Sequence, residues 1–302
     1  MSLRPSTLTL LFLTFFAFVS ATTTSKIVIS ADGTQIYADA TGDPEKQSIV
    51  FVHGLALSSI VFDRLFANKR LADYHLVRYD MRGHGRSDKP ATADAHTSIR
   101  YSQDFAAVVN AFGLKKPIFV GWSPGGKFHK TTRNTPTTTF FPLWGAVALG
   151  GSPGLNLAIL PIIASPVLLG ELPGFTANDN VTAALATRQP FIDGLFQDPA
   201  QVDFRLKAEY LGQTVVQSPA ISALVSTRSQ DLTKLFAAGE ASFPCSVLAP
   251  HFGDKLFVSK VPGGHALFDD NPEGLIDQLM WFVQKTTESG NSARSTVYSR
   301  RY

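Results

Sequence analysis

Gly121-Trp122-Ser123-Pro124-Gly125 is the stretch of this sequence that decides the fold. It follows the apolar residues Ile118-Phe119-Val120, which are typical of a buried strand. The flanking glycines carry no Cβ, so the chain can turn tightly from strand to helix and present Ser123 at the apex. A G-x-S-x-G pattern alone is weak evidence, because small residues also cluster by chance. Its position after an apolar strand makes Ser123 a candidate nucleophile.

Outward from this stretch, short apolar runs alternate with helical segments. Asp32-Gly33 is a strong hairpin signal between the first two runs. Helices are predicted over Ile60–Arg70 and over Tyr101–Phe112, which ends before Gly113. The alternation predicts an α/β fold with a mostly parallel, doubly wound sheet. The predicted strands are Lys26–Ser30, Gln35–Ala40, Ser48–His53, Leu76–Asp80, Pro117–Gly121 and Trp144–Leu149.

The second half of the chain is organised differently. Between about residues 152 and 242 there are repeated prolines and short amphipathic segments with no clear strand, which predicts a helical lid inserted over the sheet. Strands are expected again at Ser246–Ala249 and Leu256–Val261, and a closing helix at Gly274–Lys285. The polar residues 286–302 are expected to form a disordered tail.

The N-terminus has the order of a secretory signal peptide. Arg4 precedes an apolar run from Leu8 to Val19, and Val19-Ser20-Ala21 has the small-x-small form of a cleavage site. The run is short for a transmembrane helix. We therefore expect residues 1–21 to be removed and the protein to be secreted without a stable membrane span. The alternative is a membrane anchor formed by an uncleaved N-terminal segment.

The composition and motifs of the chain limit the classes of partner and cofactor that we expect. The 302 residues carry a net charge of +3, which is too small to indicate a nucleic acid partner. The single cysteine, Cys245, excludes an internal disulfide. No G-x-G-x-x-G opens a strand–helix turn and no clustered metal ligands are present, so neither a cofactor nor a metal is expected. A small molecule is the expected partner, and the oligomeric state is left open.

Four motifs in order make the chain resemble the α/β-hydrolase superfamily, in particular its lid-bearing serine hydrolases of the esterase and perhydrolase type. They span roughly residues 26–285, the expected hydrolase domain. The resemblance implies that Ser123 attacks an acyl compound, His265 is the general base, and the backbone N–H of Leu55 binds the oxyanion. It also implies structural roles for His53 and His84. The motifs are Phe51-Val52-His53-Gly54, the segment Asp80–Ser87, Gly121–Gly125 and Gly263-Gly264-His265-Ala266.

Two departures from the family pattern concern the catalytic groups. The second oxyanion donor of the family is the backbone N–H after the nucleophile, and here that residue is Pro124, which has none. Proline also favours extended backbone in its predecessor, so a relaxed turn at Ser123 is expected. The loop that carries the acid is short, and Asp254 is the candidate. Asp269 and Asp270 follow His265 too closely and are expected to cap the closing helix.

A third departure is the polar, β-branched segment 127–139, where the family has a helix of small apolar residues. Three interpretations stay open. The chain is an active serine hydrolase for esters or related acyl compounds; a catalytically impaired member that binds a small ligand; or an incomplete gene product, altered in exon choice at 127–139 and 249–254, that lacks the acid loop.

Overall fold

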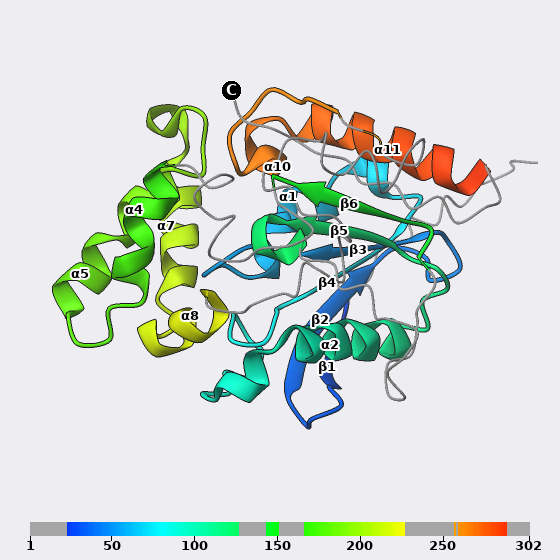
Figure 1. The fold of residues 1–302 in the computed structure, drawn as a ribbon. Helices are drawn as coiled ribbons and strands as arrows, with labels where there is room; N and C mark the ends of the chain where they lie inside the picture. Colours follow the sequence, from blue (N-terminus) through cyan, green and yellow to red (C-terminus); the bar gives the residue numbers. More distant parts are fainter. Residues whose placement is uncertain (1–22, 127–142, 151–165, 227–256, 258, 289–302) are drawn as a thin grey trace, which may run out of the picture.

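A six-stranded sheet forms the centre of the computed structural model, which describes residues 23–126, 143–150, 166–226, 257 and 259–288 (Figure 1). The strand order is β1-β2-β4-β3-β5-β6. β1 and β2 pair antiparallel with each other, β2 pairs antiparallel with β4, and the remaining pairs are parallel. The strands are β1 (Thr24–Ile29), β2 (Gln35–Thr41), β3 (Ser48–Val52), β4 (His75–Tyr79), β5 (Ile118–Trp122) and β6 (Gly145–Leu149).

The central strands are buried on both faces, which explains their continuous apolar sequence. Along β3, Ile49 and Phe51 belong to one hydrophobic cluster while Val50 and Val52 belong to another. The first cluster includes side chains of α1 (Asp63–Phe66), α10 (Leu267–Asp270) and α11 (Pro272–Glu288), and the second includes α2 (Ser98–Ala111). The sheet therefore lies between two helical layers, α2 on one face and α11 on the other (Figure 1).

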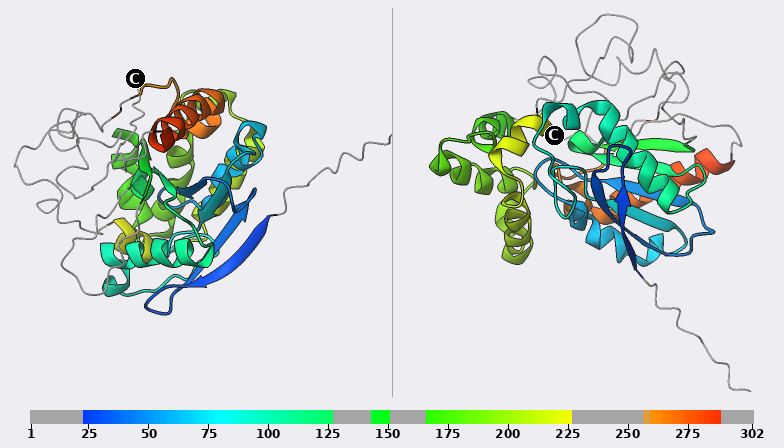
Figure 2. Two further views of the ribbon diagram at one scale, coloured as in Figure 1. Left: turned by 90° about the vertical axis from the view of Figure 1, so that its right-hand side faces the viewer. Right: turned by 90° about the horizontal axis from the view of Figure 1, so that it is seen from below.

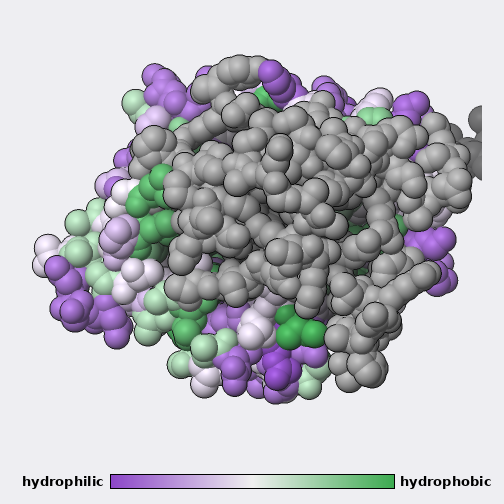
Figure 3. Space-filling model, in the orientation of Figure 1, coloured by the Kyte–Doolittle hydropathy of each residue, from purple (hydrophilic) through white to green (hydrophobic). Residues whose placement is uncertain are grey.

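Helices occupy the stretch predicted to form a lid. They are grouped on one side of the sheet, beyond the carboxyl ends of the parallel strands (Figures 1 and 2). Their exposed surface includes large apolar residues such as Val181, Leu185 and Phe204, and apolar residues are visible over this part of the molecule in Figure 3. The helices are α4 (Pro166–Phe175), α5 (Val181–Ala186), α6 (Arg188–Asp193), α7 (Phe204–Thr214) and α8 (Pro219–Ser226), with the 3-10 turn η5 (Pro199–Gln201) before α7.

Three predicted elements differ from the structure. The helix expected over residues 60–70 is divided into η1 (Ser59–Phe62), α1 and η2 (Lys69–Leu71), because Asn68 is extended and its side chain caps η2 by accepting from Arg70 N. The strand expected over 256–261 is not formed at residues 257 and 259–261. The closing helix α11 runs to Glu288, and Thr286 is buried, so the first three residues of the predicted tail are helical.

Several predicted features lie outside the described residues. These are the leader 1–21, the polar segment 127–139, the strand 246–249, Cys245 and Asp254. Within the described ranges, no helix combines the length and apolar character needed to cross a membrane.

Candidate active site

Ser123 sits at the end of β5, where the strand turns into the 3-10 helix η4 (Ser123–Gly126). Its φ is +54°, in the left-handed region that side chains other than glycine rarely adopt. The expectation of a relaxed turn is therefore wrong: despite Pro124, the serine has the strained backbone of a nucleophile elbow. Such a conformation costs about 1–3 kcal/mol and persists only where the surroundings impose it.

The two glycines of the motif explain how the surroundings impose this turn. A Cβ on Gly121 would lie 2.5 Å from the carbonyl oxygen of Gly125, and a Cβ on Gly125 would lie 2.3 Å from the carbonyl oxygen of His53. Neither contact is possible for a real side chain, so the turn packs directly on its own strand and on the end of β3. Backbone contact on two sides fixes the direction in which Ser123 leaves the sheet.

The turn also brings Ser123 next to the loop that contains Leu55. A Cβ built on Gly54 would lie 3.3 Å from Ser123 Cβ and 2.8 Å from the indole ring of Trp122. Leu55 follows Gly54 directly and is 9% exposed. The structure thus brings together the candidate nucleophile and the peptide that carries the candidate oxyanion donor.

His265 reaches the same edge of the sheet from the last loop before α10. The indole N–H of Trp122 donates to the carbonyl oxygen of His265 at 2.7 Å, and the two rings are 5.3 Å apart between centroids. A Cβ on Gly150 would lie 2.9 Å from His265 Nδ1. Trp122 pairs with Leu149 across β5 and β6, so Gly150 lies level with Ser123. His265 therefore lies against Trp122, the residue before Ser123, and close to Gly150, at the carboxyl ends of β5 and β6.

Asp269 and Asp270, which follow His265, were expected to cap α11. Both accept hydrogen bonds from other parts of the chain instead. Asp270 Oδ2 accepts from the N–H of Gly264 at 2.6 Å and from the N–H of Gln197 at 3.0 Å, which joins the His265 loop to the lid. Asp269 accepts from the hydroxyl of Tyr210 in α7. Asn271 caps α11 instead, through Gly274 N.

His53 and His84 lie beneath the site and are fully buried. Met81 N donates to His53 Nε2 at 2.9 Å, so Nδ1 carries the proton and donates to the carbonyl oxygen of Gly54 at 2.8 Å. With both ring nitrogens engaged, His53 cannot take a proton from a substrate. Burial lowers the pKa of both imidazoles, that of His84 well below its ordinary value, so both are neutral. The contacts of His53 agree with the structural role expected of it.

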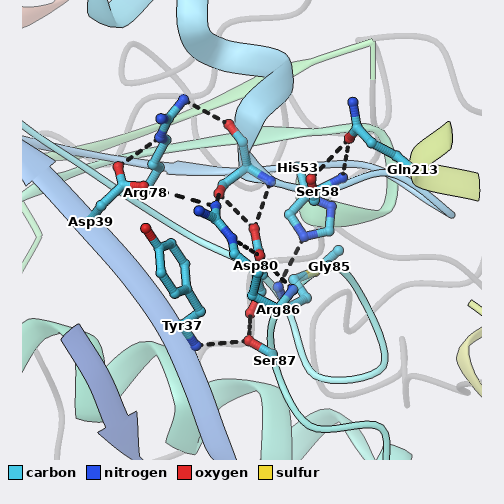
Figure 4. Close-up of polar contacts among 12 residues, drawn as sticks. Tyr37, Asp39, His53, Ser58, Arg78, Asp80, Gly85, Arg86, Ser87 and Gln213 are labelled. Carbon is cyan, nitrogen blue, oxygen red and sulfur yellow. Dashed lines mark hydrogen bonds and ion pairs between the residues drawn. The ribbon is translucent and has the colours of Figure 1, made fainter. Parts of the chain in front are cut away.

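A buried network fixes the loop after β3 to the loop after β4 (Figure 4). Asp80 is completely buried and accepts from Ser59 N and Oγ at 2.8 and 2.6 Å, and from Arg86 N and Nε at 2.8 and 3.0 Å. Burial alone would raise the pKa of Asp80, yet the hydrogen bonds from Arg86 and Ser59 hold it below its usual range. Because the carboxylate stays charged, the network holds the Leu55 loop in place at neutral pH.

Comparison with known proteins agrees with an α/β-hydrolase fold. Residues 47–128 match the family model described as the alpha/beta hydrolase fold. A non-heme chloroperoxidase from Streptomyces lividans is 35% identical over 99 residues, which are 33% of this chain and 35% of that protein. A bifunctional esterase/perhydrolase from Acinetobacter calcoaceticus is also 35% identical over 99 residues, with the same coverage. The matched stretch therefore covers about a third of the length of these relatives.

Similarity to a solved structure extends further along the chain. The crystal structure of a protein described as a candidate aryl esterase from Burkholderia cenocepacia aligns over 88% of this chain and 100% of its own. The TM-score is 0.72 at 25% sequence identity. The family match ends soon after Ser123, so it includes the candidate nucleophile and Leu55 but not His265.

Proposed function

Because this chain belongs to the α/β-hydrolase superfamily, we propose that it is a serine hydrolase that cleaves an ester or a related acyl compound. Ser123 attacks the acyl carbonyl carbon, and His265 accepts the serine proton and later donates it to the leaving group. The N–H of Leu55 donates to the oxyanion. The observation that carries the proposal is the strained φ of Ser123 at the end of β5, with His265 in contact with the preceding residue, Trp122.

The accessibility of both groups supports this assignment. Ser123 and His265 are each partly exposed, whereas His53, His75, His84 and His96 are buried. A nucleophile and its base must meet a substrate, so partial exposure at the edge of the sheet fits their roles. We propose Asp254, which lies outside the described residues, as the acid that orients His265.

Turnover of short p-nitrophenyl esters tests the proposal. The wild type should release p-nitrophenol, and Ser123→Ala and His265→Gln should each lower kcat roughly 1,000-fold or more, because removal of either group disables the attack. Ser226→Ala, a change of serine in the lid, is the matched control and should retain activity. Equal turnover by wild type and Ser123→Ala would refute the assignment.

A second candidate function has its own supporting observation. Pro124 offers no N–H to an oxyanion, which favours a catalytically impaired member that binds a small ligand under the lid. The two functions differ in reactivity, since an impaired member would bind acyl compounds without turnover. A perhydrolase would use the same Ser123 and His265, and formation of peracid from hydrogen peroxide and a carboxylate would identify it.

We also propose that the protein is secreted after cleavage behind Ala21. Expression of the full chain in a secretory host and sequencing of the mature N-terminus should give Thr22 as the first residue. An intact N-terminus found in the membrane fraction would instead support the anchored alternative.

A further inference from the structure

One lid helix turns polar side chains toward the sheet. Tyr210 and Gln213 are three residues apart, which places them along one side of α7, and Gln217 follows in the bend after the end of the helix. Tyr210 and Gln217 are buried, and Gln213 is half-buried. Burying a polar group is costly in free energy unless it is hydrogen-bonded. Buried polar side chains on this helix therefore indicate hydrogen bonds to the structure beneath it rather than apolar packing alone.

Gln213 bonds the loop that carries Leu55. Its Oε1 accepts from both the N–H and the hydroxyl of Ser58, each at 2.9 Å (Figure 4). The backbone N–H can only donate, so the amide oxygen must face Ser58. Ser58 is 4% exposed, and between it and Leu55 the chain passes through Ala56 with φ +59°. Gln213 therefore holds one end of a short, strained loop whose other end begins at Gly54.

The other two polar side chains bond one helix and one further loop at the same edge of the sheet. The Tyr210 hydroxyl donates to Asp269, four residues after His265. Gln217 Nε2 donates to the carbonyl oxygen of Gly83 at 2.8 Å, in the loop after β4. The helix α7 and the bend after it thus contact the loop of the candidate oxyanion donor, the loop after β4 and the helix that follows the candidate base.

We propose that α7 is a positioning element for the catalytic loops, and that Gln213 is the positioning residue for the Leu55 N–H. The inference rests on the proposed function. Pro124 has already removed one oxyanion donor, so transition-state stabilisation depends on where the remaining N–H points. Loss of the Gln213 acceptor would leave the N–H and hydroxyl of Ser58 unpaired in a buried position, and the loop would shift to satisfy them.

Three variants test this role. Gln213→Met keeps the length of the side chain but cannot accept a strong hydrogen bond. Gln213→Glu keeps an acceptor facing Ser58, so it should act as a rescue. Gln201→Met, at an exposed position of the lid, makes the same change of side chain where no bond is lost. For each purified variant, amide hydrogen exchange of residues 54–62 and p-nitrophenyl ester kinetics are measured.

The expected result is specific to positioning. Gln213→Met should exchange the amides of residues 54–62 at least tenfold faster and lose about tenfold in kcat, with KM changed less than twofold. Gln213→Glu should recover most of both losses, and Gln201→Met should match the wild type. Wild-type exchange in Gln213→Met would overturn the inference, as would faster exchange with unchanged kcat. If the wild type itself has no esterase activity, the proposed function fails, while the exchange result still decides whether Gln213 holds the loop.

Discussion

At the scale of the residue, Ser123 has a backbone conformation that the following Pro124 disfavours. Proline disfavours folded backbone in its predecessor, yet Ser123 keeps a φ of +54° because Gly121 and Gly125 pack against backbone atoms that leave no other path. The conformation of the candidate nucleophile is therefore decided by contacts of its glycine neighbours rather than by local preference. In the proposed mechanism, Pro124 instead removes a backbone N–H that would donate to the oxyanion.

Pro124→Ala should raise activity, because alanine supplies an N–H at the position of the second oxyanion donor. One such donor contributes roughly 100- to 1,000-fold in rate in serine hydrolases, so we expect kcat on p-nitrophenyl acetate to rise by at least tenfold. Introduced into Ser123→Ala, the same change should give no gain. A Pro124→Ala enzyme no faster than the wild type would mean that the lost N–H does not limit catalysis.

Gly125→Ala should destabilise the protein strongly. Its Cβ would lie 2.3 Å from the carbonyl oxygen of His53, and backbone cannot move away without disturbing β3. We expect the free energy of unfolding in urea to fall by about 3 kcal/mol or more.

Gly212→Ala provides the matched control for that measurement. Gly212 is in α7 and a Cβ there meets nothing within 4 Å, so the change should stabilise the protein by about 0.5–1 kcal/mol through helix propensity. If both alanine variants unfolded at the same urea concentration, the close packing of the elbow would be contradicted.

At the scale of the element, a buried carboxyl group of α10 is hydrogen-bonded to α7. Asp269 accepts from Tyr210, and its side chain is 3% exposed. Burial is the main cause that raises the pKa of Asp269 to about 6. In the unfolded chain the same carboxyl titrates near its ordinary value of 3.8. The folded state therefore binds a proton more tightly than the unfolded state, and stability is lost as pH rises from about 4 through 6.

Asp269→Asn should remove this pH dependence, because the amide oxygen still accepts from Tyr210 but carries no charge. The difference in unfolding free energy, variant minus wild type, should increase in favour of the variant between pH 4 and pH 7. A shift of about two pKa units sets an upper limit of roughly 3 kcal/mol on that increase. Urea unfolding at both pH values measures it, and a difference independent of pH would show that Asp269 titrates normally in the fold.

The elements differ in how far their sequence predicts them. β3 was expected at Ser48–His53 and is observed at Ser48–Val52, because an apolar run buried on both faces has few alternatives. The helix expected over 60–70 fails at Asn68, whose side chain caps a new turn. The polar residues of α7 and of the bend after it, Tyr210, Gln213 and Gln217, can be read from the sequence. Their partners cannot, since Ser58 precedes Gln213 by 155 positions.

At the scale of the whole molecule, the candidate groups lie at one edge of the sheet. Parallel strands end together, so Leu55 after β3 and Ser123 after β5 lie at the same edge, and this much follows from the order of the motifs along the sequence. The contact of His265 with Trp122 and Gly150 does not follow, because it depends on the packing of α10 against the sheet. The helical stretch 166–226 adds a further constraint, since it is hydrogen-bonded to the loops and to α10 at this edge.

The most direct test of the central claim is covalent labelling of the purified protein with a fluorophosphonate, followed by peptide mapping by mass spectrometry. The account predicts one adduct on Ser123, formed with wild type and Gln201→Met, slowed in His265→Gln and absent in Ser123→Ala. Absence of an adduct on the folded wild type, or an adduct on another serine that persists in Ser123→Ala, would contradict the assignment of Ser123 as the nucleophile.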